Sequence, residues 1–303
     1  MLCPLIVIAA QHSALSIPMQ IINYRSRFSL ISTVVLYFFV CLCFASHGQS
    51  LESQILPKGA RIFLLGEIHD NPNSHSLRME LVRQLISERP KPVVAMEQFD
   101  RENQPALDLA LDSCADVECV LDKTGPPGWE WRFYKPLVQL ALEKKITLIA
   151  ANLSNADMRR VMANGFSAVY SPQVIAEHKL DQIPAQLLSA QQQSIQEGHC
   201  NMLPTQAIGP MAKAQIARDV WMASVMSGVQ NQTVILIAGN GHVRKDAGVF
   251  QWLSPENKAQ TQVHGYVEAQ DKRDPNWFDY VHVVPTIERE DQCLVFQKKQ
   301  IKK

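Results

Sequence analysis

Short apolar segments alternate with longer amphipathic segments along most of the chain from residue 61 onward. The short segments are rich in Val, Ile and Leu and have the length of buried strands, at residues 61–65, 92–96, 146–150 and 233–238. The longer segments have the apolar pattern of helices, at residues 74–88, 134–144, 157–164 and 207–229. This alternation predicts an α/β fold with a central, mainly parallel sheet flanked by helices.

Two further strands are predicted near the end of the chain, at residues 263–269 and 280–284. Before them, at about residues 171–200, lies a polar, Gln-rich segment of high helical propensity. Its composition does not suit a buried sheet, so we expect a helical insertion or lid there. Residues 49–303 are long enough for a single α/β domain that contains this insertion.

The composition of residues 1–48 predicts a signal peptide. Arg25 and Arg27 precede an apolar run at residues 28–43, and small residues follow from Ala45 onward. A basic segment, an apolar segment and a cleavage site with small residues are the three parts of a secretory leader. We therefore expect an exported protein whose mature chain begins between Ala45 and Ser50.

Alternatives within the leader stay open. Met19 is a more usual start than Met1, because the eighteen residues before it have no role in a leader. The apolar run can also be a retained membrane anchor, although it is shorter than the roughly 20 residues that a spanning helix needs. Cys41 and Cys43 suggest lipoprotein processing, but neither follows a small residue, as a lipidation signal requires.

The charges of the chain balance. The sequence has 29 Lys and Arg side chains and 29 Asp and Glu side chains, which gives a net charge of +0 with the histidines neutral. A nucleic-acid backbone or an anionic membrane surface attracts a strongly basic protein. The balance therefore argues against nucleic acid as a partner.

Four cysteines remain after the leader, at Cys114, Cys119, Cys200 and Cys293. Four thiols in an exported chain can pair in three ways. Cys114 and Cys119 are close enough in the sequence to form a small ring, but spacing alone does not choose among the pairings. No short Cys-x-x-Cys pair is present in the sequence, which argues against a structural zinc site.

Polar residues follow the predicted strands where a parallel sheet collects its ligands. Glu67 and His69 follow the first strand, Glu97 follows the second, and His242 follows the fourth. Because the carboxyl ends of parallel strands share one edge, we expect these side chains in one pocket. Two imidazoles and two carboxylates can hold a divalent metal such as Mn, Fe, Co or Zn, or act as acid and base. The alternative is that they bond only to neighbouring backbone and cap helices.

An aromatic segment runs from Trp129 to Tyr134. Such a cluster packs as core under a long loop or forms the wall of a site for a flat aromatic ligand. His199, beside Cys200, can bind iron or lie on the surface next to a disulfide. Both interpretations stay open for each feature.

A set of sequence blocks occurs in order between about residues 60 and 253. The blocks are Leu64–Asn71 with His75, Ala95–Asp108, Trp131–Tyr134 with Pro136, Ala151–Asn152, His199–Cys200, Ala214–Asp219 with Met222–Ala223, and Ile237–Arg244 with Asp246–Gly248. Together they resemble the ChaN family of iron-regulated, haem-binding envelope lipoproteins. The wider superfamily, which includes the Tiki proteases and the erythromycin esterase-like proteins, shares the Gly-Glu-x-His and Gly-x-x-His motifs.

The resemblance implies a parallel α/β fold, an exported location, and haem bound at a dimer interface with a tyrosine on the iron. Tyr134 and Tyr170 are the candidate tyrosines, and His199 is the other candidate haem ligand. Arg132 and Lys135 would contact the haem propionates. The partners would be haem, a second copy of the chain and an outer-membrane haem receptor. The metal-dependent Tiki proteases imply the alternative, a metal-dependent hydrolase, protease or esterase-like, that uses the four strand-end residues.

Overall fold

The computed structural model describes residues 59–271 and 274–301, and the predicted signal peptide lies outside these residues. A six-stranded sheet runs through the described part in the order β3-β2-β4-β1-β5-β6, with every neighbouring pair parallel. The strands are β1 (Ile62–Leu65), β2 (Val93–Asp100), β3 (Thr147–Asn152), β4 (Val234–Ile237), β5 (Thr261–Glu268) and β6 (Tyr280–Val284). The predicted parallel α/β fold is confirmed.

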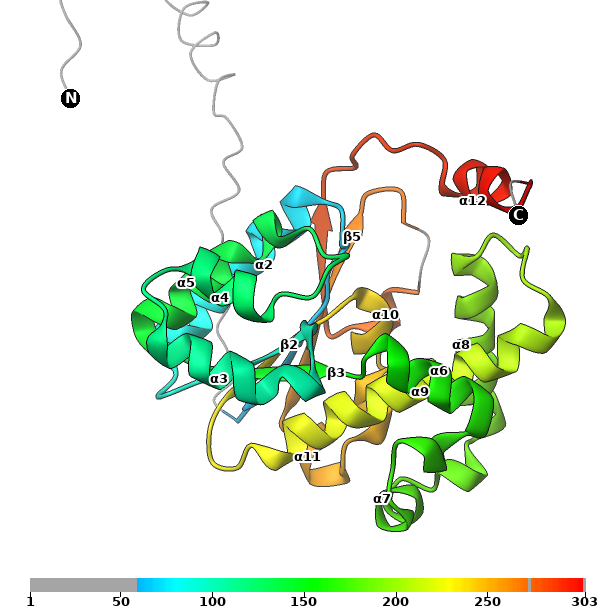
Figure 1. Ribbon diagram of the computed structural model, residues 1–303, viewed down its shortest axis with the longest axis horizontal. Coiled ribbons are helices and arrows are strands. Elements are labelled where there is room, and N and C mark those ends of the chain that lie inside the picture. Colours follow the sequence, from blue (N-terminus) through cyan, green and yellow to red (C-terminus); the bar gives the residue numbers. More distant parts are fainter. Residues whose placement is uncertain (1–58, 272–273, 302–303) are drawn as a thin grey trace, which may run out of the picture. The chain divides into compact units, whose positions relative to one another are not determined.

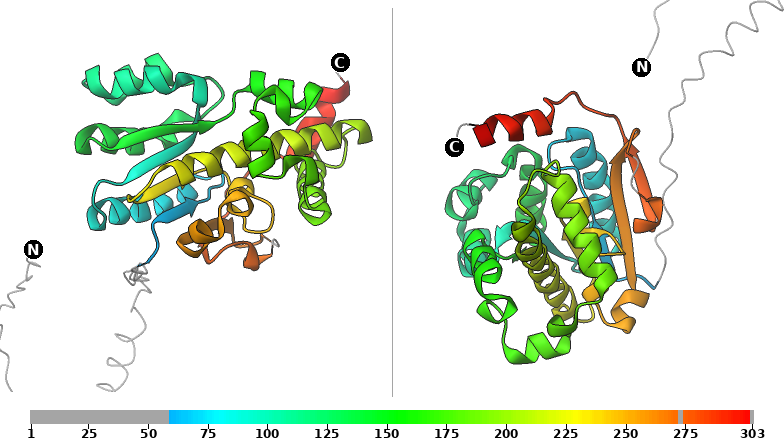
Figure 2. Two further views of the ribbon diagram at one scale, coloured as in Figure 1. Left: turned by 90° about the horizontal axis from the view of Figure 1, so that it is seen from below. Right: turned by 90° about the vertical axis from the view of Figure 1, so that its right-hand side faces the viewer.

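Helices lie on both faces of the sheet, as Figure 1 and Figure 2 show. They are α2 (Pro72–Glu88), α3 (Gln104–Ser113), α4 (Val117–Thr124), α5 (Lys135–Lys144), α6 (Asn155–Asn164), α7 (Pro172–Glu177), α8 (Ala185–Gly198), α9 (Thr205–Gly228), α10 (Asn240–Val243), α11 (Pro255–Ala259) and α12 (Gln292–Ile301). Within the described residues, no helix is both long enough and apolar enough to cross a membrane.

Each face of the sheet buries its own core. In β1, Ile62 and Leu64 pack into the cluster that α6 and α9 cover, whereas Phe63 and Leu65 pack into the cluster beneath α2, α3 and α5. All four side chains of β1 are fully buried, and so are all four of β4. Coverage on both faces explains why these strands appear in the sequence as unbroken apolar runs.

β2 is longer than the apolar run that predicted it. Its pairing with β3 shifts register between Met96 and Asp100, and the extension carries Glu97 and Gln98 at the carboxyl edge of the sheet. Both polar side chains are buried. The sequence pattern did not predict this extension, because buried strands are recognised by apolar runs and these two buried residues are polar.

The polar segment expected as an insertion or lid contains α7 and α8. α8 packs along α9, and its buried residues are Leu187, Gln191 and Ile195. The helical content therefore agrees with the sequence pattern. The division of the chain into a leader and one domain with an insertion stays a prediction.

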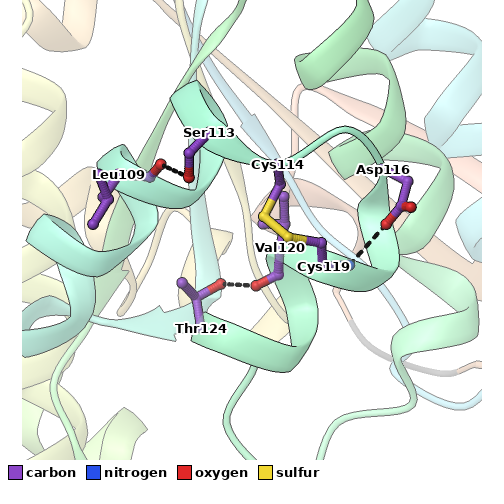
Figure 3. Close-up of a disulfide and its surroundings, with 7 residues drawn as sticks. All are labelled: Leu109, Ser113, Cys114, Asp116, Cys119, Val120 and Thr124. Atoms are coloured by element: carbon purple, nitrogen blue, oxygen red, sulfur yellow. Dashed lines mark hydrogen bonds between the residues drawn. A yellow bond between two sulfur atoms is a disulfide. The ribbon is translucent and has the colours of Figure 1, made fainter.

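Two disulfides use all four cysteines that follow the predicted leader. Cys114–Cys119 closes the turn between α3 and α4, where Asp116 Oδ1 accepts a hydrogen bond from the Cys119 N–H at 2.9 Å (Figure 3). Cys200–Cys293 joins the turn after α8 to α12 across a sequence separation of 93 residues. Of the three pairings left open by the sequence, the structure has the one that contains the small ring.

A stack of rings lies across β5 and β6. His264 Nδ1 is 3.0 Å from His282 Nε2, the Tyr280 ring stacks on His264, and the Tyr266 ring stacks on His282. Burial, together with the neighbouring His282, lowers the pKa of His264 to about 3. His264 is therefore a neutral imidazole in the folded protein at neutral pH.

Candidate functional site

The four predicted strand-end residues converge at the carboxyl edge of the sheet. Since β4 lies between β1 and β2, helix α10 after it stands between the ends of those strands. His69 Nδ1 is 2.8 Å from Glu67 Oε1, and His242 Nε2 is 3.5 Å from Glu97 Oε1. His69 Nε2 and Glu97 Oε2 both lie within 3.8 Å of the point that a Cβ on Gly239 would occupy. The two pairs of imidazole and carboxylate therefore adjoin each other.

Two glycines allow the loops after β1 and β4 to pack this closely. A Cβ on Gly239 would lie 2.8 Å from His69 Nε2, and a Cβ on Gly66 would lie 2.1 Å from Asn240 Oδ1. Asn240 Oδ1 accepts a hydrogen bond from the Tyr266 N–H at 3.1 Å, which ties α10 to β5. The repeated Gly-x-x-His pattern thus reflects a close contact between two loops as well as the placement of two histidines.

Glu67 is the centre of a buried polar cluster. Its Oε1 accepts hydrogen bonds from Tyr134 OH at 2.5 Å and from Gln98 Nε2 at 3.3 Å, and Arg78 forms an ion pair with Oε2. Glu67 and Arg78 are each 2% exposed. A buried carboxylate needs such compensation, and here a cation and several hydrogen-bond donors supply it.

The groups around Glu67 keep definite protonation states. Burial lowers the pKa of Arg78 to about 10, which leaves the guanidinium charged at neutral pH. Burial raises the pKa of Tyr134, so its hydroxyl is protonated and donates to Glu67. Burial also lowers the pKa of His75, whose Nε2 is 2.9 Å from the His69 carbonyl and therefore carries the proton. The cluster is an ion pair surrounded by neutral donors.

A second buried cluster holds His242. Asp219 Oδ1 is 2.6 Å from His242 Nδ1, and Gln191 Nε2 donates to Asp219 Oδ2 at 2.9 Å. Burial opposes the charge of His242, but the carboxylates of Glu97 and Asp219 outweigh it and raise the pKa of this histidine. Asp219 fixes Nδ1 as a donor, so Nε2 is the atom that faces Glu97.

The aromatic segment Trp129–Tyr134 packs against this edge of the sheet. The Trp129 ring meets His69 edge-on with centroids 5.3 Å apart, and Phe133 stacks on His75 at 4.5 Å. Arg132 and Lys135, expected to contact propionates, form ion pairs with the exposed side chains of Glu130 and Glu118. The segment therefore supports the histidine loop from one side and joins the core through the buried Tyr134.

A pocket of about 490 Å³ opens at the same edge. It is lined from the loop after β1, from α8 and α9, and from the loop and helix after β4, by Glu67, Ile68, His69, Asp70, Gln191, Ser194, Ile195, Gly198, His199, Gln215, Gly239, Asn240, Gly241 and His242. Its volume is within the range of small-molecule sites. The helical segment after β3 thus supplies one wall, which the sequence pattern did not connect to the strand-end residues.

The three candidate haem ligands occupy different environments. Tyr134 and Tyr170 are buried, and their hydroxyls donate to Glu67 Oε1 and to the Ala217 carbonyl at 2.5 Å each. Burial raises the pKa of both phenols. His199 instead lines the pocket directly after the end of α8, and Ile195 in the last turn of that helix lines the pocket too. Of the three, only His199 lies at the pocket.

The described residues contain no group of three or more His, Cys, Asp or Glu side chains that could hold a metal ion. The divalent metal site expected from Glu67, His69, Glu97 and His242 is therefore not supported. The physical reason is that Arg78 already neutralises Glu67, while Asp219 and the Gly239 N–H engage His242 and Glu97. The charges of these side chains are balanced within the site. The metal-dependent hydrolase is therefore not favoured.

Sequence reasoning assigned no role to Arg78 or Asp219, although both lie in the resembling segments or beside them. Each is a charged residue beside apolar positions of its helix: Arg78 adjoins Met79 and Val82 in α2, and Asp219 adjoins Val220 in α9. A charge at such a position needs a buried partner. The positions of Arg78 and Asp219 in the sequence therefore indicate buried charge pairs but do not identify the residues with which they pair.

Comparisons with known proteins agree with this architecture. The sequence profile of the family described as haem-binding uptake, Tiki superfamily, ChaN, matches residues 57–253. A solved structure of ChaN from Campylobacter jejuni, described as binding haem cofacially, is 20% identical, with 74% of this chain and 87% of that chain covered and a TM-score of 0.59. The erythromycin esterase EreC in its open conformation is 15% identical, with 70% and 71% covered and a TM-score of 0.43. No protein with a curated description matches the sequence.

The fold and the pocket define an α/β protein with a pocket at the carboxyl edge of a parallel sheet. The family profile spans well over half of the chain, so the chain belongs to the haem-binding uptake family ChaN of the Tiki superfamily. The resemblance drawn from the sequence blocks is confirmed, and the structure of Campylobacter jejuni ChaN shares the fold.

Proposed function

We propose that this chain is an exported haem-binding protein of haem or iron uptake. The observation that carries the proposal is the family match over residues 57–253. The structure of Campylobacter jejuni ChaN, which is described as binding haem cofacially, supports it through the shared fold. Haem is the ligand, and the chain itself supplies binding and orientation.

His199 is the proposed axial ligand of the haem iron. Imidazole is a common haem ligand, and His199 lies at the pocket while the hydroxyls of Tyr134 and Tyr170 are engaged inside the core. His199 Nδ1 is 2.8 Å from the Ile195 carbonyl, so iron would bind through Nε2. Ile195 adds apolar surface beside it.

The pocket lining, as far as the structure describes it, offers no cation to the propionates of haem. Glu67 and Asp70, which belong to the lining, are already paired with Arg78 and Arg289, and the described lining residues include no Lys or Arg side chain. The propionates would therefore point out of the pocket, and the porphyrin would lie at the rim. A second copy of the chain would cover the face that the rim leaves open, which supports a homodimer.

Adding hemin to the purified mature protein is expected to produce a Soret band that saturates at a fixed stoichiometry. The variant His199→Ala should weaken hemin binding by about tenfold or more, because loss of a ligand costs at least as much as loss of a residue that orients one. The variants Tyr134→Phe and Tyr170→Phe keep their rings and remove only the hydroxyls, so both should retain the spectrum of the unmodified protein. Absorbance titration measures all three.

Two results separate the function from the ligand assignment. Absence of saturable hemin binding by the unmodified protein contradicts the proposed function. Binding that survives in His199→Ala but is lost in one Tyr→Phe variant contradicts only His199 as ligand and assigns the iron to that tyrosine.

Export is the second part of the proposal. The leader pattern supports a mature chain that begins between Ala45 and Ser50, in the periplasm or attached to the envelope, where an outer-membrane haem receptor would be its partner. N-terminal sequencing of the envelope fraction should find this start. An uncleaved chain in the cytoplasm would contradict export, and an uncleaved chain in the membrane would identify a retained anchor.

A further inference from the structure

The segment after β6 crosses from one rim of the pocket to the other. Figure 1 shows it in red, leaving β6 above the ends of the strands and reaching α12 near the end of α8. We call residues 285–293 the C-terminal strap. Hydrogen bonds hold one end of the strap and a disulfide holds the other. The hydrogen bonds reach Asp70, which lines the pocket, and the disulfide reaches Cys200, which follows the lining residue His199.

The first fastening joins the strap to the loop after β1. Arg289 donates from Nε to Asp70 Oδ2 at 2.6 Å and from Nη2 to Asp70 Oδ1 at 2.9 Å, and its Nη2 also donates to Glu268 Oε1 at 2.7 Å. Asn71 Nδ2 donates to the Pro285 carbonyl at 2.9 Å. Asp70 is part of the pocket lining, so the strap holds this rim directly.

The second fastening is covalent. Cys293, at the start of α12, forms a disulfide with Cys200, which directly follows His199 on the opposite rim. Cys200 and Asn201 both have positive φ, at 58° and 56°, so the chain turns sharply at this point. The disulfide therefore ties the end of α8 to the strap at the turn that presents His199.

The remainder of α8 is held independently of the disulfide. Gln191 donates to Asp219 Oδ2 at 2.9 Å and to the Ala247 carbonyl at 3.0 Å, and Arg244 Nη1 donates to Ser194 Oγ at 2.9 Å. These bonds anchor the helix up to about its middle. Beyond Ser194, Ile195 packs with Ile208 and Ala212 of α9, and the disulfide links the turn after α8 covalently to α12.

We propose that the C-terminal strap is a redox-dependent clasp of the pocket rim: the Cys200–Cys293 disulfide fixes the wall that carries His199, and reduction of that disulfide by a dithiol releases this wall. One dithiol gives two electrons and two protons and becomes a cyclic disulfide, while Cys200 and Cys293 each become a thiol. Release then frees the turn after α8 from the strap, while Arg289 keeps the other end of the strap in place. An oxidising compartment keeps this wall fixed.

The variant Cys114→Ser/Cys119→Ser isolates this disulfide, because dithiothreitol then acts on Cys200–Cys293 alone. Hydrogen exchange followed by mass spectrometry should show, on adding dithiothreitol, exchange that is roughly tenfold faster or more in residues 195–204 and 286–301. Residues 185–191 should not change. The reciprocal variant Cys200→Ser/Cys293→Ser should exchange fast in those segments without reductant and show no further change in them.

Unchanged hydrogen exchange in residues 195–204 after complete reduction contradicts the proposed role of the strap. Global acceleration that includes β1 and β4 also overturns it, because the disulfide would then stabilise the whole fold rather than one wall. If the reciprocal variant does not fold, reduction of the folded Cys114→Ser/Cys119→Ser protein still decides the question. The variant Arg289→Gln, which loosens the other end, should accelerate exchange in residues 286–290.

The effect of the strap on haem rests on the proposed function. Hemin bound to the oxidised Cys114→Ser/Cys119→Ser protein should dissociate faster after reduction, since His199 lies on the wall that is released. The exchange measurement contains no hemin, so the two proposals fail separately. Faster exchange without any hemin binding supports the role of the strap and contradicts the haem site. Hemin binding that does not change on reduction contradicts the strap as a regulator of haem binding.

Discussion

Replacing Arg78 by Met is expected to lower the free energy of unfolding by about 3–5 kcal/mol, the usual cost of breaking a buried ion pair. The substitution leaves the Glu67 carboxylate buried without its cation, while Tyr134, Gln98 and His69 remain as donors. Methionine fills a similar volume, so the decrease in the free energy of unfolding measures mainly the loss of the charge and not a loss of packing. Urea unfolding at pH 7 measures it.

Two further variants show whether the ion pair is the cause. The control Arg83→Met removes an exposed charge from the same helix and should change the free energy of unfolding by no more than about 0.5 kcal/mol. The double variant Glu67→Gln/Arg78→Met leaves no buried carboxylate at this site and should be more stable than Arg78→Met alone. A double variant that is less stable than Arg78→Met would contradict the account.

Acid is expected to destabilise the fold through His264. Its folded pKa of about 3 lies below the ordinary value of 6.5, so between these values the unfolded chain binds a proton that the folded protein does not. Stability is therefore complete above pH 6.5 and falls as the pH drops toward 3, with a slope that approaches about 1.4 kcal/mol per pH unit for one proton. The loss reaches several kcal/mol near the lower limit.

Comparison of variants isolates this histidine from the other titrating groups. In urea unfolding between pH 7 and pH 4, His264→Gln should show a shallower decline than the unmodified protein, because glutamine binds no proton in either state. Parallel declines for His264→Gln and the unmodified protein would mean that His264 takes up its proton without unfolding.

The strands were predictable from the sequence because both faces of the sheet are covered. Ile62–Leu65 and Val234–Ile237 are fully buried, which produces apolar runs that no helix face shares. The convergence of Glu67, Glu97 and His242 followed from the same logic, since parallel strands end at one edge. The sequence therefore predicts the strands of the sheet and the sheet edge at which the candidate residues lie.

The partners within the site could not be predicted, because they depend on contacts between distant helices. Arg78 reaches Glu67 from α2, and Asp219 reaches His242 from α9. Spacing along the chain does not encode which of several buried charges meet. The same holds for the wall supplied by α8: its Gln-rich sequence indicates a helix, while its position over the pocket depends on Gln191 and Ser194 finding α9 and the loop after α10.

The position of β4 in the sheet determines when the fold can be completed. β4 separates β1 from β2 and pairs with both, yet it begins about 170 residues after β1 in the chain. A growing chain that contains only the first three strands can pair β2 with β3, but β1 has no neighbour until β4 and β5 have been made. Pairing over such separations is slow, because a long loop must close before any contact forms. A chain that cannot complete its sheet early stays unfolded until β4 has been made, which is compatible with the export proposed above.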